Sequence, residues 1–335
     1  MNIVYIIGNG FDLNLDLKTR YQDFYKYFIK QSSNEKLVAE MKDILYSETW
    51  ADLEVALGEY TAKFTSTEKF LKVYFEISDK LAEYIGIEEE KLILSEEKKQ
   101  KLCNDIIHPE IYLRPDDSKI VAKYEEKWKT YSPWYVNIIN FNYSKTIEKI
   151  LNLKNRETIL LGKNRYEKNE TLSQIVHIHG VAEKNNTILL GVNDISQIAN
   201  ESFRTDIDIL DIFVKPQSNN GIGEGIDADC ERFLHYANLI CIFGSSIGET
   251  DKKWWELLGK QLKRDDCRVI CFTREKDIIQ GNRKQLLPKK IRECQSLLLS
   301  KTNLSSSEQE QVKNKIWVGY NTDMFNLYNS QAGIL

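Results

Sequence analysis

Several features that mark specialised classes of protein are scarce or missing in this sequence. Its six cysteines show no Cys-x-x-Cys spacing, and only four histidines and five prolines occur among 335 residues. The chain starts with an apolar run rather than with a basic and then apolar signal segment, so we expect a reduced, cytoplasmic protein without a disulfide framework. No apolar run approaches the ~20 residues of a membrane-spanning helix, which predicts a protein that does not enter the membrane.

An excess of one charge is missing too. Lysine and arginine number 46 against 50 aspartates and glutamates, which leaves a formal net charge of -4 at pH 7. Proteins that bind nucleic acid through their overall field are basic, so we do not expect nucleic acid as a partner. What is present is typical of a globular protein: 42% of the residues are hydrophobic and 11% are aromatic. The chain is long enough for one large domain or two ordinary ones.

Residues 2–13, NIVYIIGNGFDL, predict a strand followed by a tight loop. Residues 3–7 form a continuous apolar run, mostly β-branched, which is typical of a central parallel strand buried on both faces. Gly8-Asn9-Gly10 then lets the backbone turn sharply and approach a ligand closely, and a helix start after such a loop offers N–H groups to phosphate. The full Gly-x-Gly-x-x-Gly motif is absent because residue 13 is leucine. The loop is therefore either part of a nucleotide site or an ordinary strand-to-helix turn.

A long stretch after this loop has the periodicity of helices. Large apolar residues share one helical face in three segments, namely Tyr21, Phe24, Tyr25 and Phe28, then Leu53, Ala56, Leu57 and Tyr60, then Phe70, Tyr74, Ile77, Leu81 and Tyr84. They predict a large all-helical insertion over residues 20–130. Because the chain leaves the first strand at its carboxyl end, we expect these helices beside the ligand site, as a lid or as a surface for a partner or for oligomerisation.

From residue 131 onward, apolar runs alternate with helical patterns. The runs are 135–141, 158–161, 174–178, 187–190, 238–243, 268–272 and 316–318, and the helical patterns are 144–151, 227–237, 250–263 and 283–296. This alternation predicts an α/β fold with a doubly wound, mainly parallel, Rossmann-like sheet. The predicted domains are a nucleotide-binding domain, residues 1–19 and 131–335, and the helical insertion, residues 20–130.

Polar residues and glycines follow several of the apolar runs. Open parallel sheets bind ligands at the carboxyl ends of their strands, which makes Asn142, His179 and Gly244 candidates for a site. A purely structural role fits Asn142 equally well, because it could simply cap a helix. For His179, taken alone, the structural role of a satisfied buried histidine is favoured. His177 and His179 also share one face of a strand, as metal ligands often do. No His-Glu-x-x-His motif or cysteine cluster accompanies them, so we expect no metal.

The segment GSSIG, residues 244–248, fits two kinds of site. It matches the Gly-x-Ser-x-Gly pattern of serine hydrolases if Ser246 is the nucleophile, but His235 precedes the serine instead of following it. The hydroxyl and N–H groups of the same segment could equally hold a phosphate or a ribose, or the segment could be a plain turn before a helix.

Taken in order, six short motifs resemble those of the AbiH family of bacterial phage abortive-infection proteins. They are GNGFDL at 8–13, followed by Thr19-Arg20-Tyr21 and Phe24, then WADLE at 50–54, NFNYS at 140–144, HIHG at 177–180, LLGVND at 189–194 and FGSSIGETD at 243–251. That family in turn is similar to the sirtuin-like NAD-binding fold. The resemblance implies an antiphage protein with a glycine loop, an asparagine, a histidine and a Gly-Ser motif around one nucleotide pocket.

The resemblance implies roles for individual residues. Asn142 would position water or a ribose hydroxyl, and His179 would act as the base. The remaining contacts to the nucleotide would come from Gly8, Asn9, Gly10, Phe11, Asp12, Glu54, Gly244, Ser245, Ser246 and Asp251. Sirtuin-type motifs place an acidic residue where this chain has Ser144, and no four-cysteine zinc module is present. We therefore expect hydrolysis of the nicotinamide–ribose bond of NAD rather than protein deacylation.

The sequence is compatible with two further functions. The protein could be a nucleotide-binding sensor or a partner-recruiting module without turnover, and Ser144 in place of an acid supports that alternative. A nuclease toxin would need metal-binding carboxylates that the sequence does not assemble. Trp50 and Glu54 share a helical face, so Glu54 is either a surface ion-pair residue or an auxiliary polar contact. The sequence does not distinguish NAD from NADP or another nucleotide, or say whether a phage or defence-system protein, or a second copy, is a partner.

Overall fold

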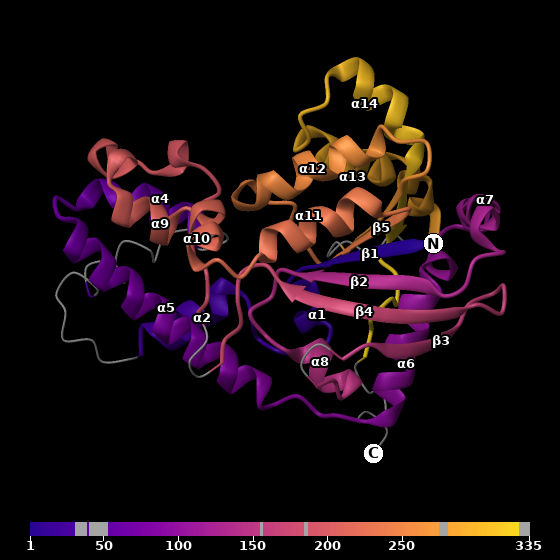
Figure 1. Cartoon of the computed structure of the whole chain (residues 1–335), viewed down its shortest axis with the longest axis horizontal. Coiled ribbons are helices and arrows are strands. Elements are labelled where there is room, and N and C mark those ends of the chain that lie inside the picture. The colour runs from indigo at the N-terminus through magenta and orange to yellow at the C-terminus, as the bar shows by residue number, and fades with distance from the viewer. Residues whose placement is uncertain (31–38, 40–52, 155–156, 184–186, 275–280, 328–335) are drawn as a thin grey trace.

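A computed structural model describes residues 1–30, 39, 53–154, 157–183, 187–274 and 281–327, without the side chains of 281–283. Within these residues the chain forms a mixed α/β structure around a seven-stranded sheet (Figure 1). The strands are β1 (Asn2–Ile7), β2 (Trp134–Asn140), β3 (Ile159–Lys163), β4 (Asn169–His177), β5 (Leu239–Phe243), β6 (Arg268–Thr273) and β7 (Ile316–Tyr320).

The sheet is mostly parallel, as the sequence predicts. Its strand order is β3-β4-β2-β1-β5-β6-β7, and β3 pairs antiparallel with β4 whereas the other neighbours pair in parallel. The chain builds outward from β1 through β2 to β4 on one side, and from β5 through β6 to β7 on the other. The order therefore reverses between β1 and β5, and open sheets bind ligands at such a reversal.

Strand β1 lies in the centre of the sheet and is buried on both faces. Ile3, Tyr5 and Ile7 belong to a hydrophobic cluster on one face, whereas Val4 and Ile6 belong to a cluster on the other. Side chains of a strand alternate between its two faces, so the continuous apolar run supplies both clusters. The register also aligns Ile7 with Asn140 of β2 and Phe243 of β5, which brings the loops after these strands to one edge.

Helices cover both faces of the sheet. In the described part of the chain the α-helices are α1 (Gly10–Leu13), α2 (Tyr21–Phe28), α4 (Leu53–Tyr60), α5 (Thr67–Glu89), α6 (Glu96–Ile107), α7 (Pro115–Glu125), α8 (Thr146–Leu151), α9 (Ile207–Phe213), α10 (Lys215–Ile222), α11 (Ile226–Tyr236), α12 (Lys252–Leu262), α13 (Leu287–Ser300) and α14 (Ser306–Val312). Side chains of α6, α7 and α8 enter the cluster on one face, and those of α11 to α14 enter the cluster on the other.

The helices of the predicted insertion divide between two hydrophobic clusters. Helices α2, α4 and α5 pack with residues 188–214 in a third cluster, away from the sheet; we call residues 21–28, 53–89 and 188–214 the helical lobe. It stands to one side of the sheet in Figure 1. Helices α6 and α7 pack on the sheet instead, where the Tyr5 hydroxyl donates to the Ile106 carbonyl at 2.7 Å and the Tyr124 hydroxyl donates to the Asn238 carbonyl at 2.8 Å.

One predicted strand is wrong. Residues 187–190 form no strand of the sheet; Ile188 makes an isolated bridge to Gly180. Ile188 and Leu190 are buried in the helical lobe. A short apolar run has the same appearance whether a sheet or another hydrophobic cluster buries it, so the run alone could not distinguish a strand from a buried loop. The predicted helical patterns at 144–151, 227–237, 250–263 and 283–296 overlap α8, α11, α12 and α13, respectively.

Glu170 on β4 provides a test of the packing at the amino end of the sheet. Its side chain is fully buried, and among the described residues no hydrogen bond of full geometry reaches either carboxylate oxygen, although the Asn164 side chain acts as a weak donor that opposes the rise in pKa. Burial, aided by the charges of Glu125 and Glu110, raises the pKa of Glu170 to about 8. A carboxyl group with a raised pKa destabilises the fold progressively as pH increases from the unfolded-state pKa towards the folded-state value.

We therefore expect Glu170→Gln to be more stable than the wild-type protein at pH 8, by roughly 1–3 kcal/mol, and nearly equal to it at pH 4. Chemical denaturation of both proteins across this pH range measures the difference. A gap that stayed constant with pH would show that Glu170 is ionised in the folded state.

Candidate functional site

Two loops meet at the carboxyl edge of the sheet, where β1 and β5 end. The Gly8 N–H donates to the Phe243 carbonyl at 2.8 Å, and the Gly10 N–H donates to the Gly244 carbonyl at 2.9 Å. A Cβ atom on Gly10 would lie 2.5 Å from the Gly244 Cα, so both positions require glycine. The two predicted nucleotide loops thus pack on each other, and the N–H groups of Gly8 and Gly10 are engaged within the protein.

Asn142 braces this glycine loop. Its side-chain amide donates to the Gly8 carbonyl at 3.2 Å, and its own N–H donates to the Asn140 side chain at 3.0 Å. Asn9 is tied down in turn by hydrogen bonds with Thr19. Asn142 is buried, and its known contacts hold the loop in place, which adds a structural role to the catalytic role predicted for it.

Asp12 supplies a carboxylate beside Ser144, the residue at which the resemblance to sirtuin-type motifs would predict an acid. The Ser144 hydroxyl donates to Asp12 Oδ2 at 2.6 Å, and the Thr146 hydroxyl donates to Oδ1 at 2.8 Å. Burial raises the pKa of Asp12 to about 6, against the opposing effect of these two hydrogen bonds. The fold therefore places a carboxylate from α1 next to Ser144, which itself is not acidic. The neighbouring Phe11 is buried against Phe325, with ring centroids 5.4 Å apart.

The two histidines of HIHG have different surroundings. His177 is satisfied at both ring nitrogens: Nδ1 lies 2.9 Å from the Asn142 carbonyl and Nε2 lies 2.6 Å from Glu148 Oε1. Burial opposes its protonation, but Glu148 outweighs burial and raises the pKa of His177. Both ring nitrogens therefore have a partner that can accept a hydrogen bond. His177 is thus a structural residue.

His179 is buried as well, but its ring is not satisfied. Its Nε2 atom lies 2.9 Å from Asp251 Oδ1, an ion-pair distance without hydrogen-bond geometry, and its Nδ1 atom has no hydrogen-bond partner within the described chain. The rings of Phe141 and Tyr143 lie beside it, with centroids 5.3 and 6.4 Å away. A proton on Nε2 that faces Asp251 leaves the lone pair on Nδ1, so the ring can accept a proton there.

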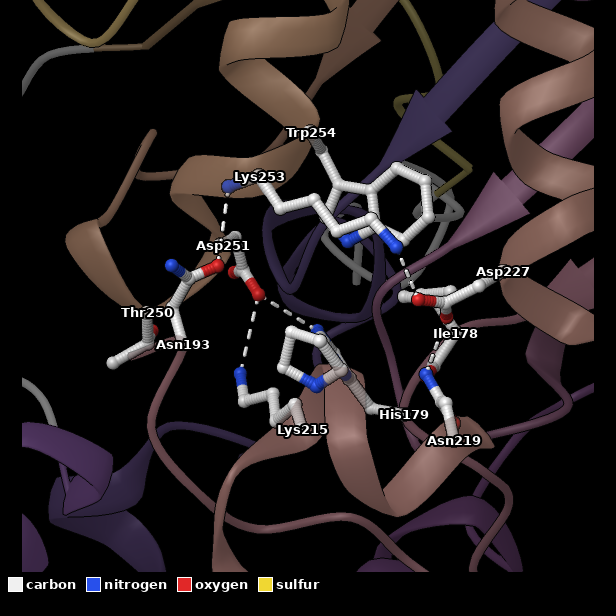
Figure 2. A pocket seen from close by; sticks show the side chains of 11 residues that line it. Ile178, His179, Asn193, Lys215, Asn219, Asp227, Thr250, Asp251, Lys253 and Trp254 are labelled. Atoms are coloured by element: carbon white, nitrogen blue, oxygen red, sulfur yellow. Dashed lines mark hydrogen bonds and ion pairs between the residues drawn. The ribbon is translucent and has the colours of Figure 1, made fainter. Parts of the chain in front are cut away.

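Asp251 connects His179 to a lysine that the sequence analysis missed. Lys215 Nζ lies 3.1 Å from Asp251 Oδ1 and 2.7 Å from Glu54 Oε2, and Figure 2 shows Asp251 between Lys215 and His179. Burial opposes the charged forms, yet the two carboxylates raise the pKa of Lys215, and Lys215 with His179 lowers the pKa of Asp251. Glu54 also accepts from the Tyr143 hydroxyl at 3.4 Å. These residues form one buried ionic chain, Glu54–Lys215–Asp251–His179.

His179, Lys215 and Asp251 line one side of a pocket, and a second polar group lines its other side. The Asn219 amide donates to Asp227 Oδ1 at 2.6 Å, and the Lys253 ammonium pairs with Asp227 (Figure 2). Lys253 also pairs with Glu231 at 2.9 Å. The Lys253 N–H donates to the Asn193 side chain at 3.1 Å. The wall of the pocket therefore comes from residues after β4, from α10 and α11, and from the start of α12.

The structure thus separates the predicted site residues into two neighbouring groups. Glu54, His179 and Asp251 join the ionic chain, whereas Asn142 and Asp12 belong to the glycine-loop group. Ser245 accepts from the Ile247 N–H at 3.1 Å, and Ser246 is exposed; among the described contacts neither serine bonds to a histidine. Trp50 lies outside the described residues.

Lys215 gave no sign of its role in the sequence. It follows an apolar helical segment and precedes Pro216, as an ordinary helix-start lysine would, and its partner Glu54 is 161 residues away. No group of three or more His, Cys, Asp or Glu side chains in the described ranges is arranged to hold a metal ion. Among the helices that the structure describes, none has the length and hydrophobicity needed to span a bilayer.

Comparison with known proteins identifies one family. The model of the family described as "Bacteriophage abortive infection AbiH" matches residues 4–273, which include both groups of site residues. No curated protein matches the chain.

The contact between the two glycine loops leads to a prediction about stability. Gly10→Ala places a methyl group against the backbone of Gly244, so we expect a loss of roughly 1–3 kcal/mol in the free energy of unfolding, or failure to fold. Gly86→Ala in α5 is the matched control, because nothing lies within 4 Å of its added Cβ, and alanine should stabilise that helix slightly. Denaturant titration compares the two; equal stabilities would contradict the packing of the loops.

Proposed function

The chain belongs to the AbiH family of bacteriophage abortive-infection proteins, and from that premise we propose that it defends its host by hydrolysing NAD at the nicotinamide–ribose bond. The family supports the role in defence. The proposed chemistry is supported by the position of the site at the carboxyl edge of the parallel sheet, beside the reversal of strand order where open sheets of this kind bind their ligands.

One observation carries the proposed chemistry. His179 is a buried histidine whose Nε2 faces the carboxylate of Asp251, while its Nδ1 has no partner among the described residues. A carboxylate that faces one ring nitrogen orients the ring and stabilises the imidazolium that forms when the other nitrogen takes up a proton. A structural histidine such as His177 has both nitrogens engaged. His179 is therefore the better candidate for a general base.

In the proposed reaction one bond of NAD breaks and one bond to water forms. The bond between ribose C1′ and the pyridinium nitrogen breaks, and its electron pair stays with the nitrogen, so that nicotinamide leaves as a neutral molecule. A new bond forms between C1′ and the oxygen of water, and His179 Nδ1 accepts the proton that the water loses. The products are nicotinamide, ADP-ribose and a proton. Because the leaving group needs no acid, catalysis depends on stabilising a cationic ribose and on orienting water.

The geometry also changes the roles we propose for the loops. Since the N–H groups of Gly8 and Gly10 bond within the protein, these glycines shape the site and permit close approach, and we assign contact with phosphate or ribose to the exposed Ser246 instead. Asn142 holds the glycine loop and stands at the end of β2, next to Phe141 and Tyr143 that flank His179. The helical lobe would cover the open side and exclude water that is not reacting.

A second candidate function has one observation in its favour. The Asn142 amide and the glycine-loop N–H groups already have protein partners, so the site could bind a nucleotide without turning it over. The protein would then be a nucleotide-binding sensor in the same defence role.

Purified protein incubated with NAD, and analysed by mass spectrometry for nicotinamide and ADP-ribose, separates these functions. We expect cleavage by the wild-type protein and a loss on the order of 100-fold or more in His179→Ala, because the base is removed. Asp251→Asn should also lose activity. His235→Ala is the matched control, since this histidine is exposed on α11 and should leave activity unchanged. A strong chelator should have no effect.

The other results are equally informative. Bound but intact NAD would favour the sensor, and the absence of both binding and cleavage would reject NAD as the ligand. Full activity in His179→Ala would exclude the mechanism. Asn142→Ala should lose activity too, but its thermal stability must be measured alongside, because Asn142 also holds the glycine loop.

A further inference from the structure

The ionic chain crosses between two parts of the protein. Glu54 is on α4 of the helical lobe, whereas Asp251 follows β5 and His179 follows β4. Figure 1 shows α4 to one side of these two strands. Lys215 begins α10 and contacts both carboxylates, at 2.7 Å to Glu54 and 3.1 Å to Asp251. The side chains of Lys215 and Glu54 are each 6% exposed, so bulk water screens their interaction poorly. Lys215 is thus shared between the lobe and the site.

Asp251 is shared in the same way. A single atom, Oδ1, lies 3.1 Å from Lys215 Nζ and 2.9 Å from His179 Nε2 (Figure 2). Two cationic partners of one carboxylate oxygen compete, because the negative charge that attracts the ammonium is the charge that stabilises a protonated imidazole. Whatever draws Lys215 away from Asp251 therefore strengthens the hold of Asp251 on His179.

We propose that Glu54 and Lys215 are positioning residues, and that Glu54 draws Lys215 towards the helical lobe so that Asp251 stays available to His179. This role rests on the proposed function, and it places control of the basicity of His179 outside the reacting groups. In this role Glu54 acts through Lys215 and Asp251, instead of contacting the nucleotide directly as the sequence predicts. It also gives the helical lobe a regulatory role, since displacement of α4 would release Lys215 to Asp251 and weaken the base.

The other groups around His179 do not provide the same control. The aromatic rings of Phe141 and Tyr143 flank it. Of the charged side chains that line the pocket in the described chain, Asp227 and Lys253 form a pair of their own on the opposite wall. Glu54 and Lys215 reach His179 through Asp251, and Glu54 is the member that the helical lobe carries.

Titration of the His179 ring by NMR, in protein labelled with carbon-13 at histidine, tests the inference without any substrate. Glu54→Gln leaves Asp251 as the carboxylate that pairs with Lys215 among the described residues, so His179 should titrate at lower pH than in the wild type. Lys215→Met frees Asp251 for His179, so His179 should titrate at higher pH. We expect the shift in Lys215→Met to be about one pH unit, and the opposite shift in Glu54→Gln to be smaller, because Glu54 acts on His179 only through Lys215 and Asp251.

Lys215→Met could fail to fold because it leaves two buried carboxylates without their cation. The double variant Glu54→Gln/Lys215→Met removes one charge of each sign and keeps the test available; its His179 should titrate at higher pH than in Glu54→Gln. Lys101→Met is the matched control, because Lys101 pairs with the buried Asp105 on α6, away from the site. It should leave the titration of His179 unchanged.

The acidic limb of the pH–rate profile for NAD cleavage should move in the same directions as these titrations, with Lys215→Met losing activity near neutral pH and recovering it at higher pH. A residue with a purely structural role would lower the rate at every pH alike. Identical His179 titrations in all variants, or an upward shift in Glu54→Gln, would overturn the inference. If the titrations shift as expected but no NAD is cleaved, the proposed function fails and the ionic control of His179 stands.

Discussion

The close approach of two backbones organises the functional edge of this protein. Gly8 and Gly10 after β1 lie directly against Gly244 after β5, with hydrogen bonds from both glycine N–H groups across the contact. No side chain fits between them. This contact lies at the point where the strand order reverses. It fixes the start of α1, from which Asp12 reaches Ser144. It also fixes the path of the chain towards Asp251. The loops therefore frame the site more than they offer it donors.

Charge organises the pocket beside this frame. Four ionisable groups from distant segments, Glu54, Lys215, Asp251 and His179, stand in one buried chain, and each internal member has two partners. A buried charge without a partner costs several kcal/mol, so these groups must be assembled together by the fold. The result is a histidine that is held on one side only, which is the arrangement a general base requires. The same chain ties the helical lobe to the sheet.

The sequence predicts the parts of this structure that are encoded locally. The apolar run of β1 and its glycine loop, the mainly parallel sheet and several helices follow from short-range patterns, and the motif order points to the AbiH family. The strand predicted at 187–190 is wrong because an apolar run does not reveal which cluster buries it. Lys215 could not be predicted, since its role arises from a carboxylate 161 residues away. The difference in role between His177 and His179 likewise depends on Glu148 and Asp251, which only the fold brings close to them.

The central proposal is that this site uses a water molecule to cleave NAD, with His179 receiving its proton. Cleavage in water enriched in oxygen-18, followed at once by mass spectrometry of the products, tests it most directly. We expect ADP-ribose that carries one heavy oxygen, and nicotinamide that carries none. Cleavage that gave unlabelled product would contradict water as the nucleophile, and intact NAD after incubation with wild-type protein would contradict the enzyme itself.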